Sequence, residues 1–142
     1  MSEAFPVVIH HNPDCGTSRN VLEIVRASGY APTIIPYLEI GWTRPQLQAL
    51  FAAAGKSPRD VLRIPPSRGA EFAALAAATD DDAIFAAMVA HPILVNRPIV
   101  ATPKGVRLCR PSETVAALLD RLPDHVIYKE DGAIAFDPGA VA

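Results

Sequence analysis

Short apolar runs and apolar residues at helical spacing follow one another along the chain, and each change of pattern marks a predicted element. The continuous apolar run at 7–10 predicts a short strand buried on both faces. Apolar residues at helical spacing follow within 21–25, and Gly29 ends that helix. Residues 33–38 predict a second strand, with Pro36 at an edge or a strand end because proline lacks an N–H. A strand, a helix and a strand in so few residues favour a right-handed βαβ unit.

The middle of the chain has the pattern of several short helices. A capping-box sequence at 43–46 precedes an apolar helical stripe. Pro58 stands where the first residue of another short helix is expected. Two segments rich in alanine, roughly 68–78 and 80–90, contain good helix formers with little bulk. We therefore expect an all-helical insertion at about 57–90.

The next part of the chain predicts a β-hairpin and then a helix. Apolar runs at 99–102 and 106–109 flank Pro103-Lys104-Gly105, a turn sequence in which glycine can take a positive φ. A last helix is predicted to open at Pro111-Ser112-Glu113, with an apolar face made of valine and leucine.

The order of these elements indicates the fold class. A βαβ unit, then helices, then a ββα unit is the order of the thioredoxin-like fold, an α/β fold with a mixed sheet. We expect a single domain over 1–142, because no long polar linker interrupts it. The helical insertion at about 57–90 would separate the two parts of the sheet. The C-terminal tail, about 123–142, contains turn residues and one possible extra strand at 126–128.

Composition and charge exclude several functional classes. The chain has 142 residues with 13 basic and 15 acidic side chains, a net charge of −2, which argues against a broad basic surface for nucleic acid. There is no apolar run of about 18 residues, so no membrane span is expected. The N-terminal residues lack the basic and apolar regions of a signal peptide. We expect a cytoplasmic protein in which both cysteines stay reduced.

The loop at 11–19 carries the residues with the clearest chemistry. It joins the first predicted strand to the first helix, so Cys15 falls at or just before the helix start. The free N–H groups of a helix start favour negative charge, which lowers the pKa of a thiol and can also hold an oxyanion. Thr17 or Ser18 is expected to cap the helix. An inert buried cysteine is the alternative, but the polar neighbours of Cys15 favour an exposed turn.

Three blocks of sequence resemble the bacterial arsenate reductases that are coupled to glutaredoxin and glutathione. The first is His11-Asn12-Pro13 with Cys15-Gly16-Thr17-Ser18-Arg19, the second is the whole of 91–100, and the third is 107–113. The blocks stand in the same order as in that family. The resemblance runs from about Val7 to the helix after Ser112, and it implies the thioredoxin-like fold and Cys15 as the catalytic nucleophile.

The resemblance also implies the residues of an anion site. Arg63, Arg97 and Arg110 match the arginines that line this site in the family, and Pro98 matches a cis-proline beside the nucleophile. The guanidinium group suits this role because it stays charged and donates two parallel hydrogen bonds to an oxyanion. From the residues alone, Arg97 could equally be a solvated charge at a strand end.

Other loop residues would support the site. Gly16, Thr17 and Ser18 belong to the matched block, and His11 either tunes the loop by hydrogen bonds, as in the family, or simply closes the strand. Arg19, on the first helix, is a fourth candidate for the anion site, although a surface or capping role is favoured for it.

The sequence departs from the family after Arg63. There, Ile64-Pro65-Pro66 stands where the family often has a basic residue, and an early helix end at this point would limit the reach of Arg63.

Motifs that the chain lacks narrow the mechanism. Ser18 stands three residues after Cys15, so there is no Cys-x-x-Cys pair and the electrons must come from an external thiol. Val21 stands six residues after Cys15, which excludes the phosphatase-like class of arsenate reductases with its Cys-x5-Arg loop. Cys109 is expected to be a packed thiol. The histidines and cysteines show no metal-ligand spacing, so no metal is expected.

These observations predict an arsenate reductase with no bound cofactor. By resemblance, the Cys15 thiolate attacks arsenate and expels hydroxide or water, glutathione then adds as co-substrate, and glutaredoxin removes the glutathione as arsenite leaves. Arsenate, glutathione and glutaredoxin are thus the expected partners. Two alternatives remain open: a thiol reductase of the same fold that acts on another substrate, and a non-enzymatic binding module similar to transcription regulators of this fold.

Overall fold

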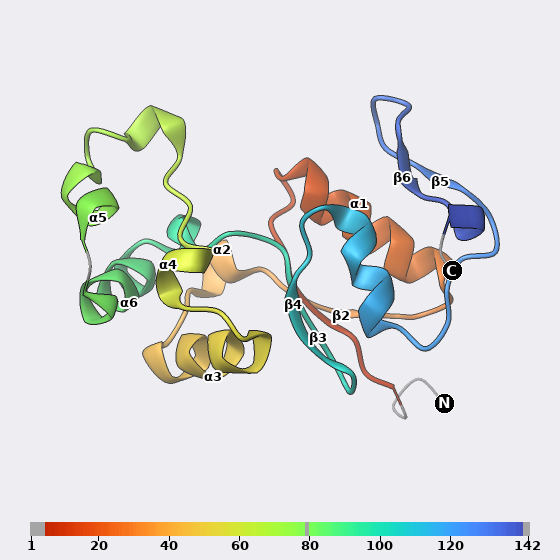
Figure 1. Cartoon of the computed structure of the whole chain (residues 1–142), viewed down its shortest axis with the longest axis horizontal. Helices are drawn as coiled ribbons and strands as arrows, with labels where there is room; N and C mark the ends of the chain where they lie inside the picture. Colours follow the sequence, from red (N-terminus) through yellow and green to blue (C-terminus); the bar gives the residue numbers. More distant parts are fainter. Residues whose placement is uncertain (1–4, 79, 141–142) are drawn as a thin grey trace. The chain divides into compact units, whose positions relative to one another are not determined.

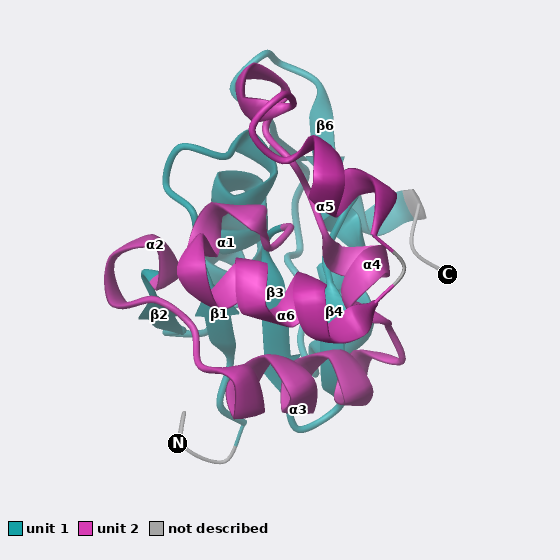
Figure 2. Cartoon of the chain, turned by 90° about the vertical axis from the view of Figure 1, so that its left-hand side faces the viewer, with its two compact units in different colours: residues 1–36, 97–142 teal, residues 37–96 magenta. Residues whose placement is uncertain are grey.

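The structure is a computed structural model that describes residues 5–78 and 80–140, shown in Figure 1. The chain divides into two compact units, which are coloured separately in Figure 2. The first unit takes residues 1–36 and 97–142, and the second takes the intervening residues 37–96. The candidate nucleophile Cys15 therefore belongs to the first unit.

A four-stranded mixed sheet forms the centre of the first unit, with the strand order β2-β1-β3-β4. Its strands are β1 (Val8–His10), β2 (Thr33–Ile35), β3 (Ile99–Thr102) and β4 (Gly105–Leu108). β1 pairs in parallel with β2 and antiparallel with β3, and β3 pairs antiparallel with β4. Helix α1 (Gly16–Ala27) makes the crossover between β1 and β2. The predicted thioredoxin-like order is confirmed.

The core of this unit lies between the sheet, α1 and a 3₁₀ segment, η4 (Ser112–Leu118). Fully buried valine and isoleucine side chains contribute to it from each layer: Ile9 and Val100 from the sheet, Val21, Ile24 and Val25 from α1, and Val115 from η4. The spacing of the buried residues of α1 is that of one helix face, as the sequence pattern predicted. Their burial fixes the start of α1 against the sheet edge.

The C-terminal tail contains a second, two-stranded sheet. Its strands are β5 (Ile127–Tyr128) and β6 (Ile134–Phe136), which pair antiparallel, and η5 (Pro138–Ala140) follows them. The possible extra strand at 126–128 is therefore present, with a partner that the sequence pattern did not indicate. Ile127 and Phe136 are buried in the core of the unit, and this burial holds the hairpin against α1.

The second unit contains helices from end to end. They are α2 (Tyr37–Ile40), α3 (Arg44–Ala54), α4 (Pro58–Val61), η2 (Pro66–Arg68), α5 (Ala73–Ala77), α6 (Asp81–Ala90) and η3 (Pro92–Leu94). The predicted capping box at the start of α3 is confirmed, since Thr43 Oγ1 accepts the Gln46 N–H. The cap of α6 is Asp80, whose side chain accepts the Asp82 N–H.

The compact helical unit at 37–96 is wider than the insertion expected at 57–90. Aromatic contacts explain the difference. Tyr37 packs against Trp42 with ring centroids 5.0 Å apart, and Phe51 of α3 stacks on Phe85 of α6 at 5.8 Å. The Phe51–Phe85 stack joins α3 to α6, and α2 contacts η3, so α2 and α3 belong to the same compact unit as the later helices.

Three other predicted elements differ in the structure. The second strand ends at Ile35, because Pro36 has no N–H for the ladder and a helical turn begins at Tyr37. The last helix is a 3₁₀ segment whose bonds span three residues, as between the Leu119 N–H and the Ala116 carbonyl. Only Ala73–Ala77 of the predicted helix at 68–78 is α-helical.

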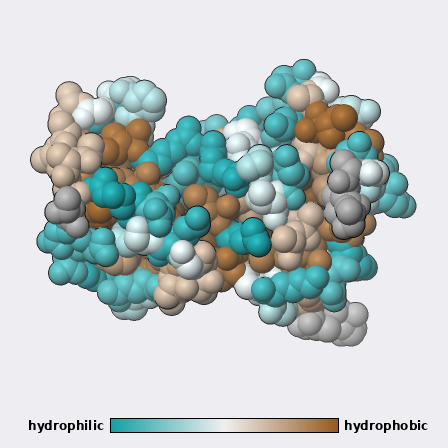
Figure 3. All heavy atoms as spheres, viewed as in Figure 1, coloured by the Kyte–Doolittle hydropathy of each residue, from teal (hydrophilic) through white to brown (hydrophobic). Residues whose placement is uncertain are grey.

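Surface character agrees with a chain of small net charge. Hydrophilic residues cover much of the face drawn in Figure 3, with hydrophobic residues between them. Within the ranges that the structure describes, none of the helices has the length and apolar character needed to cross a membrane.

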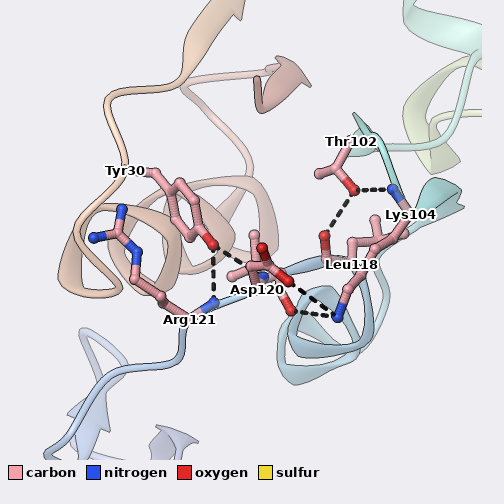
Figure 4. A network of polar contacts seen from close by, with 7 residues as sticks. Tyr30, Thr102, Lys104, Leu118, Asp120 and Arg121 are labelled. Atoms are coloured by element: carbon pink, nitrogen blue, oxygen red, sulfur yellow. Dashed lines mark hydrogen bonds and ion pairs between the residues drawn. The ribbon is translucent and has the colours of Figure 1, made fainter. Parts of the chain in front are cut away.

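A polar network ties the end of η4 to the rest of the first unit (Figure 4). The Tyr30 hydroxyl accepts the N–H groups of Asp120 at 2.9 Å and Arg121 at 2.8 Å. From the end of β3, Thr102 Oγ1 donates to the Leu118 carbonyl at 2.7 Å. The end of η4 is thereby held to the sheet, and the residues after it are held to the loop that follows α1.

Replacing Tyr30 by phenylalanine should destabilise the protein by about 1–3 kcal/mol, because two partly buried N–H groups lose their acceptor. The ring, which packs on Phe5 and lies under the Arg121 guanidinium, would be kept. Equilibrium urea unfolding measures the change. Tyr128→Phe is the control, since Tyr128 is 62% exposed. Equal free energies of unfolding for the two variants would contradict the assigned role of this hydroxyl.

Candidate functional site

The register of the sheet brings three separate segments to one edge. β1 and β3 are aligned with His10 opposite Ile99, and β3 and β4 with Ile99 opposite Leu108. Beyond the ladder, the Cys109 N–H still donates to the Pro98 carbonyl at 2.9 Å. One residue further, Arg97 and Arg110 stand opposite each other. The loop that leaves β1 begins at the same edge, and it contains Cys15.

Local hydrogen bonds shape the loop between β1 and α1. The Asn12 carboxamide oxygen accepts the Asp14 N–H at 2.9 Å, and the Asn12 carbonyl accepts the Cys15 N–H at 3.1 Å. These bonds form a tight turn of the Asx type. Cys15 then occupies the position before the first residue of α1, with extended backbone at φ −98° and ψ 120°. The Arg19 N–H donates to the Cys15 carbonyl at 3.0 Å and starts the helix.

The expected cap by Thr17 or Ser18 is wrong, because Cys15 itself occupies the capping position. The Ser18 hydroxyl is instead used inside the loop. It lies 2.7 Å from His11 Nδ1 and accepts the Asn12 N–H at 3.1 Å. Ser18 is fully buried, so this hydroxyl links the end of β1 to the first turn of α1 in the interior.

The protonation state of His11 follows from its surroundings. Burial lowers the pKa of His11, and the positive charges of Arg26 and Arg19 lower it further. The uncharged imidazole is therefore favoured, and His11 Nδ1 shares a hydrogen bond with the Ser18 hydroxyl. His11 follows β1 directly, and its hydrogen bond with Ser18 also makes it part of the loop network.

The Cys15 sulfur lies among hydrogen-bond donors. Arg110 Nη1 is 3.6 Å from Cys15 Sγ, and the Arg97 side chain also donates to the sulfur. Burial raises the pKa of Cys15, but the Ser18 N–H and the two guanidinium groups outweigh it, so the net pKa is below the usual thiol value. The sulfur makes no regular capping hydrogen bond, and the Ser18 N–H acts on it as a nearby dipole.

Arg110 is held in place by a second contact. The same Nη1 that faces the sulfur donates to the Arg97 carbonyl at 3.0 Å. The guanidinium group thus bridges the start of β3 and the nucleophile, while its other N–H groups can serve a ligand. The peptide bonds before Pro98 and Pro111 are both cis; the first agrees with what the family resemblance implied.

Arg63 belongs to the helical unit at 37–96. It was expected near the end of the short helix, but α4 ends at Val61. Leu62 forms an antiparallel bridge with Val95, and the Arg63 N–H donates to the Leu94 carbonyl at 2.8 Å. This bridge, rather than a helix, sets the backbone of Arg63. Its part in anion binding stays a prediction.

Cys109 has the opposite environment to Cys15. It is completely buried, and burial raises the pKa of its thiol to about 12, although a hydrogen bond with Thr114 acts in the other direction. Its Sγ also lies 3.8 Å from the Arg107 carbonyl. A thiol with so high a pKa is protonated at neutral pH and is a poor nucleophile.

One contact of the loop was not foreseen from the sequence. Arg19 donates through Nη1 to the Pro13 carbonyl at 2.7 Å, and through Nε and Nη2 to both carboxylate oxygens of Glu130 at 2.9 and 2.8 Å. Glu130 lies in the turn between β5 and β6. The separation of the two residues in the chain left no pattern that could have indicated this pair.

The arrangement suits nucleophilic attack on an oxyanion. It combines a thiol of lowered pKa, a helix start and two guanidinium groups within one small region. Within the described ranges, no group of three or more histidine, cysteine, aspartate or glutamate side chains is placed to hold a metal ion. The groups that this arrangement offers for chemistry are the Cys15 thiolate and the two guanidinium groups beside it.

Known proteins that are similar to this chain act on an oxyanion, as their names state. Residues 10–118 match the model of the ArsC family. The chain is 57% identical over 131 residues to the arsenate reductase ArsI2 of Synechocystis, covering 92% of this chain and 94% of that protein. It is 47% identical over 131 residues to the arsenate reductase of Escherichia coli K12, covering 92% and 93%. The structure of an arsenate reductase from Vibrio cholerae superposes with a TM-score of 0.74 at 37% identity, over 81% of this chain and 98% of the other.

Alanine in place of Arg97 or Arg110 should raise the pKa of Cys15, because each side chain donates to the sulfur and stabilises the thiolate. Below the new pKa, more of the thiol is protonated and alkylation slows. Lysine at either position should restore part of the shift, since it restores the charge. The measurement is the pH dependence of Cys15 alkylation in a Cys109→Ser background. An alkylation midpoint unchanged by both alanine variants would contradict the geometry.

Proposed function

This chain belongs to the ArsC family, and from that membership and the geometry around Cys15 we propose that it is an arsenate reductase that takes its electrons from glutathione and glutaredoxin. The observation that carries the proposal is the Cys15 thiol of lowered pKa with Arg110 Nη1 at 3.6 Å and the Arg97 guanidinium donating to the same sulfur.

Arsenate binding would use the cations that already face the nucleophile. At neutral pH arsenate is an oxyanion with one or two negative charges, and its oxygens accept hydrogen bonds in the planar geometry that guanidinium groups offer. Arg97 and Arg110 would each turn N–H groups toward it. The part of Arg63 rests on the family resemblance alone. The first turn of α1 supplies backbone N–H groups that have no partner within the helix.

The first chemical step would join sulfur to arsenic. The Cys15 thiolate attacks the arsenic atom, an S–As bond forms, and one As–O bond breaks as the oxygen leaves with a proton as water or hydroxide. The arginines stabilise the charge on the remaining oxygens. The same cations that lower the pKa of Cys15 thus serve both the nucleophile and the bound anion.

Reduction requires two electrons and a second thiol. Glutathione would add to the arsenic adduct, and the two thiols together supply the electron pair that takes arsenic from the pentavalent to the trivalent state. The overall balance is H₃AsO₄ plus two thiols giving H₃AsO₃, one disulfide and water. The glutaredoxin thiolate would attack the glutathione sulfur, which breaks the bond between that sulfur and arsenic and leaves trivalent arsenic on Cys15. Water would then displace Cys15 as arsenite leaves, so the disulfide in the balance joins glutathione to glutaredoxin.

Two features of the chain support an external supply of electrons. Ser18 stands where a Cys-x-x-Cys protein would have its second cysteine. Cys109 is completely buried with a pKa of about 12, so it is unsuited to resolve a disulfide at Cys15. We place the reaction in the cytoplasm, where glutathione and glutaredoxin stay reduced.

The proposal predicts that one cysteine is essential and the other is not. Cys15→Ser should abolish the formation of arsenite from arsenate with glutathione and glutaredoxin, because a hydroxyl is not ionised at neutral pH. Cys109→Ser should keep most of the activity and lose about 1 kcal/mol of stability, since it buries a hydroxyl in a packed position. Arsenite is measured directly, alongside the free energy of unfolding.

Three outcomes would count against this function. A wild-type chain that forms no arsenite with glutathione and glutaredoxin would exclude it. A folded Cys109→Ser variant without activity would contradict the mechanism with a single protein thiol. Full activity in Cys15→Ser would show that Cys15 is not the nucleophile of the reaction.

A further inference from the structure

A cavity of about 300 Å³ lies between the first turns of α1 and the turn of the β5–β6 hairpin. It is lined by residues of both elements: Gly16, Thr17 and Asn20 from the helix, and Lys129, Glu130 and Asp131 from the hairpin. The hairpin packs against α1, as Figure 1 shows. The volume is at the lower end of the range for small-molecule sites, about 300–1,000 Å³.

The wall of this cavity is fixed by the Arg19–Glu130 pair. Both carboxylate oxygens of Glu130 accept from Arg19, and the third hydrogen bond of Arg19 goes to the Pro13 carbonyl in the nucleophile loop. The hairpin turn is ordered as well, since the Ala133 carbonyl accepts the Lys129 N–H at 2.6 Å. The cavity is therefore a built feature that is connected to the loop of Cys15.

The charges on the wall are arranged for a zwitterion. Glu130 is neutralised by Arg19, which leaves Lys129 and Asp131 as one positive and one negative group. One oxygen of Asp131 accepts the Ala133 N–H at 2.9 Å, and the other can accept from a ligand. Among the residues that the structure describes, no carboxylate is paired with the Lys129 ammonium group. Thr17 and Asn20 add a hydroxyl and an amide that can bond to a peptide.

We propose that this cavity binds glutathione, and that Lys129 is the residue that selects it over simple thiols. Glutathione carries two carboxylates and one ammonium group at neutral pH, with its thiol on the middle residue. Lys129 would pair with a carboxylate and Asp131 with the ammonium group. This assignment rests on the proposed function, because it names where the co-substrate of that reaction is held.

The position of the cavity fits the second step of the reaction. Gly16 lines it and is bonded directly to Cys15, whose own side chain is not part of the lining, so the thiol of a bound tripeptide would extend past Gly16 to reach arsenic on Cys15. Arg97 and Arg110, which face the sulfur, do not line it. The oxyanion and the thiol would therefore use different residues and meet at Cys15. Binding of one can be weakened without weakening the other.

Binding can be tested without any turnover. S-methylglutathione, which has no free thiol, is titrated into the ¹⁵N-labelled wild-type protein, and amide shifts are followed by NMR. The largest shifts are expected at 16–20 and 129–131. Lys129→Glu should raise the dissociation constant about five- to tenfold, because it reverses the pairing charge. Lys56→Glu is the matched control, since Lys56 lies in the helical unit and outside the cavity.

A kinetic experiment tests the selectivity. With arsenate as substrate, Lys129→Glu should raise the KM for glutathione about five- to tenfold while the KM for arsenate stays unchanged. Lys129→Glu should lose more of its kcat/KM with glutathione than with 2-mercaptoethanol, which has no carboxylate, whereas Lys56→Glu should keep the wild-type ratio of the two. Asn20→Phe, which fills the cavity with an uncharged ring, should also raise the KM for glutathione. Thermal unfolding checks that each variant is folded.

The outcomes separate the two proposals. Equal affinity of wild type and Lys129→Glu for S-methylglutathione, or shifts confined to other residues, would overturn the glutathione site even if arsenite is formed. A wild-type protein that makes no arsenite with any thiol would overturn the proposed function, and the NMR titration would still decide whether the cavity binds the tripeptide.

Discussion

The antiparallel pairing of β3 with β1 on one side and β4 on the other is the constraint on which the site depends. Because the registers are fixed by buried residues such as Ile9 and Val100, the positions just beyond the strands are fixed as well. Arg97 and Arg110 meet there, beside the loop that carries Cys15. A shift of one residue in either register would turn a core side chain to the opposite face and separate the arginines from the sulfur.

The electrostatics of the site balance burial against nearby positive charge. Burial alone would keep the Cys15 thiol protonated, as it does for Cys109, whose pKa is raised to about 12. At Cys15, two guanidinium groups and the Ser18 N–H reverse the direction. The cost of placing positive groups close together is relieved when an anion binds, whether this is the thiolate or an oxyanion. Nucleophile activation and anion binding thus have the same physical source.

The C-terminal hairpin adds a second wall beside the start of α1. Its apolar residues Ile127 and Phe136 enter the core, which places the polar turn between the strands next to the first turns of the helix. The Arg19–Glu130 pair is exposed, and such pairs contribute little stability, about 0.2–1 kcal/mol. The pair instead fixes the position of the hairpin turn, because Arg19 also donates to the Pro13 carbonyl of the nucleophile loop.

The sequence by itself determined the order of the elements, the helix start at Cys15 and the lack of a Cys-x-x-Cys pair there, because these depend on local periodicity, on turn residues and on spacing within a few residues. It could not determine the extent of the helical unit, which aromatic pairs such as Phe51 with Phe85 set. The tertiary structure alone decided that Ser18 bonds to His11 and that Arg19 reaches Glu130. Contacts between residues far apart in the chain arise from packing of complete elements, and no local pattern records them.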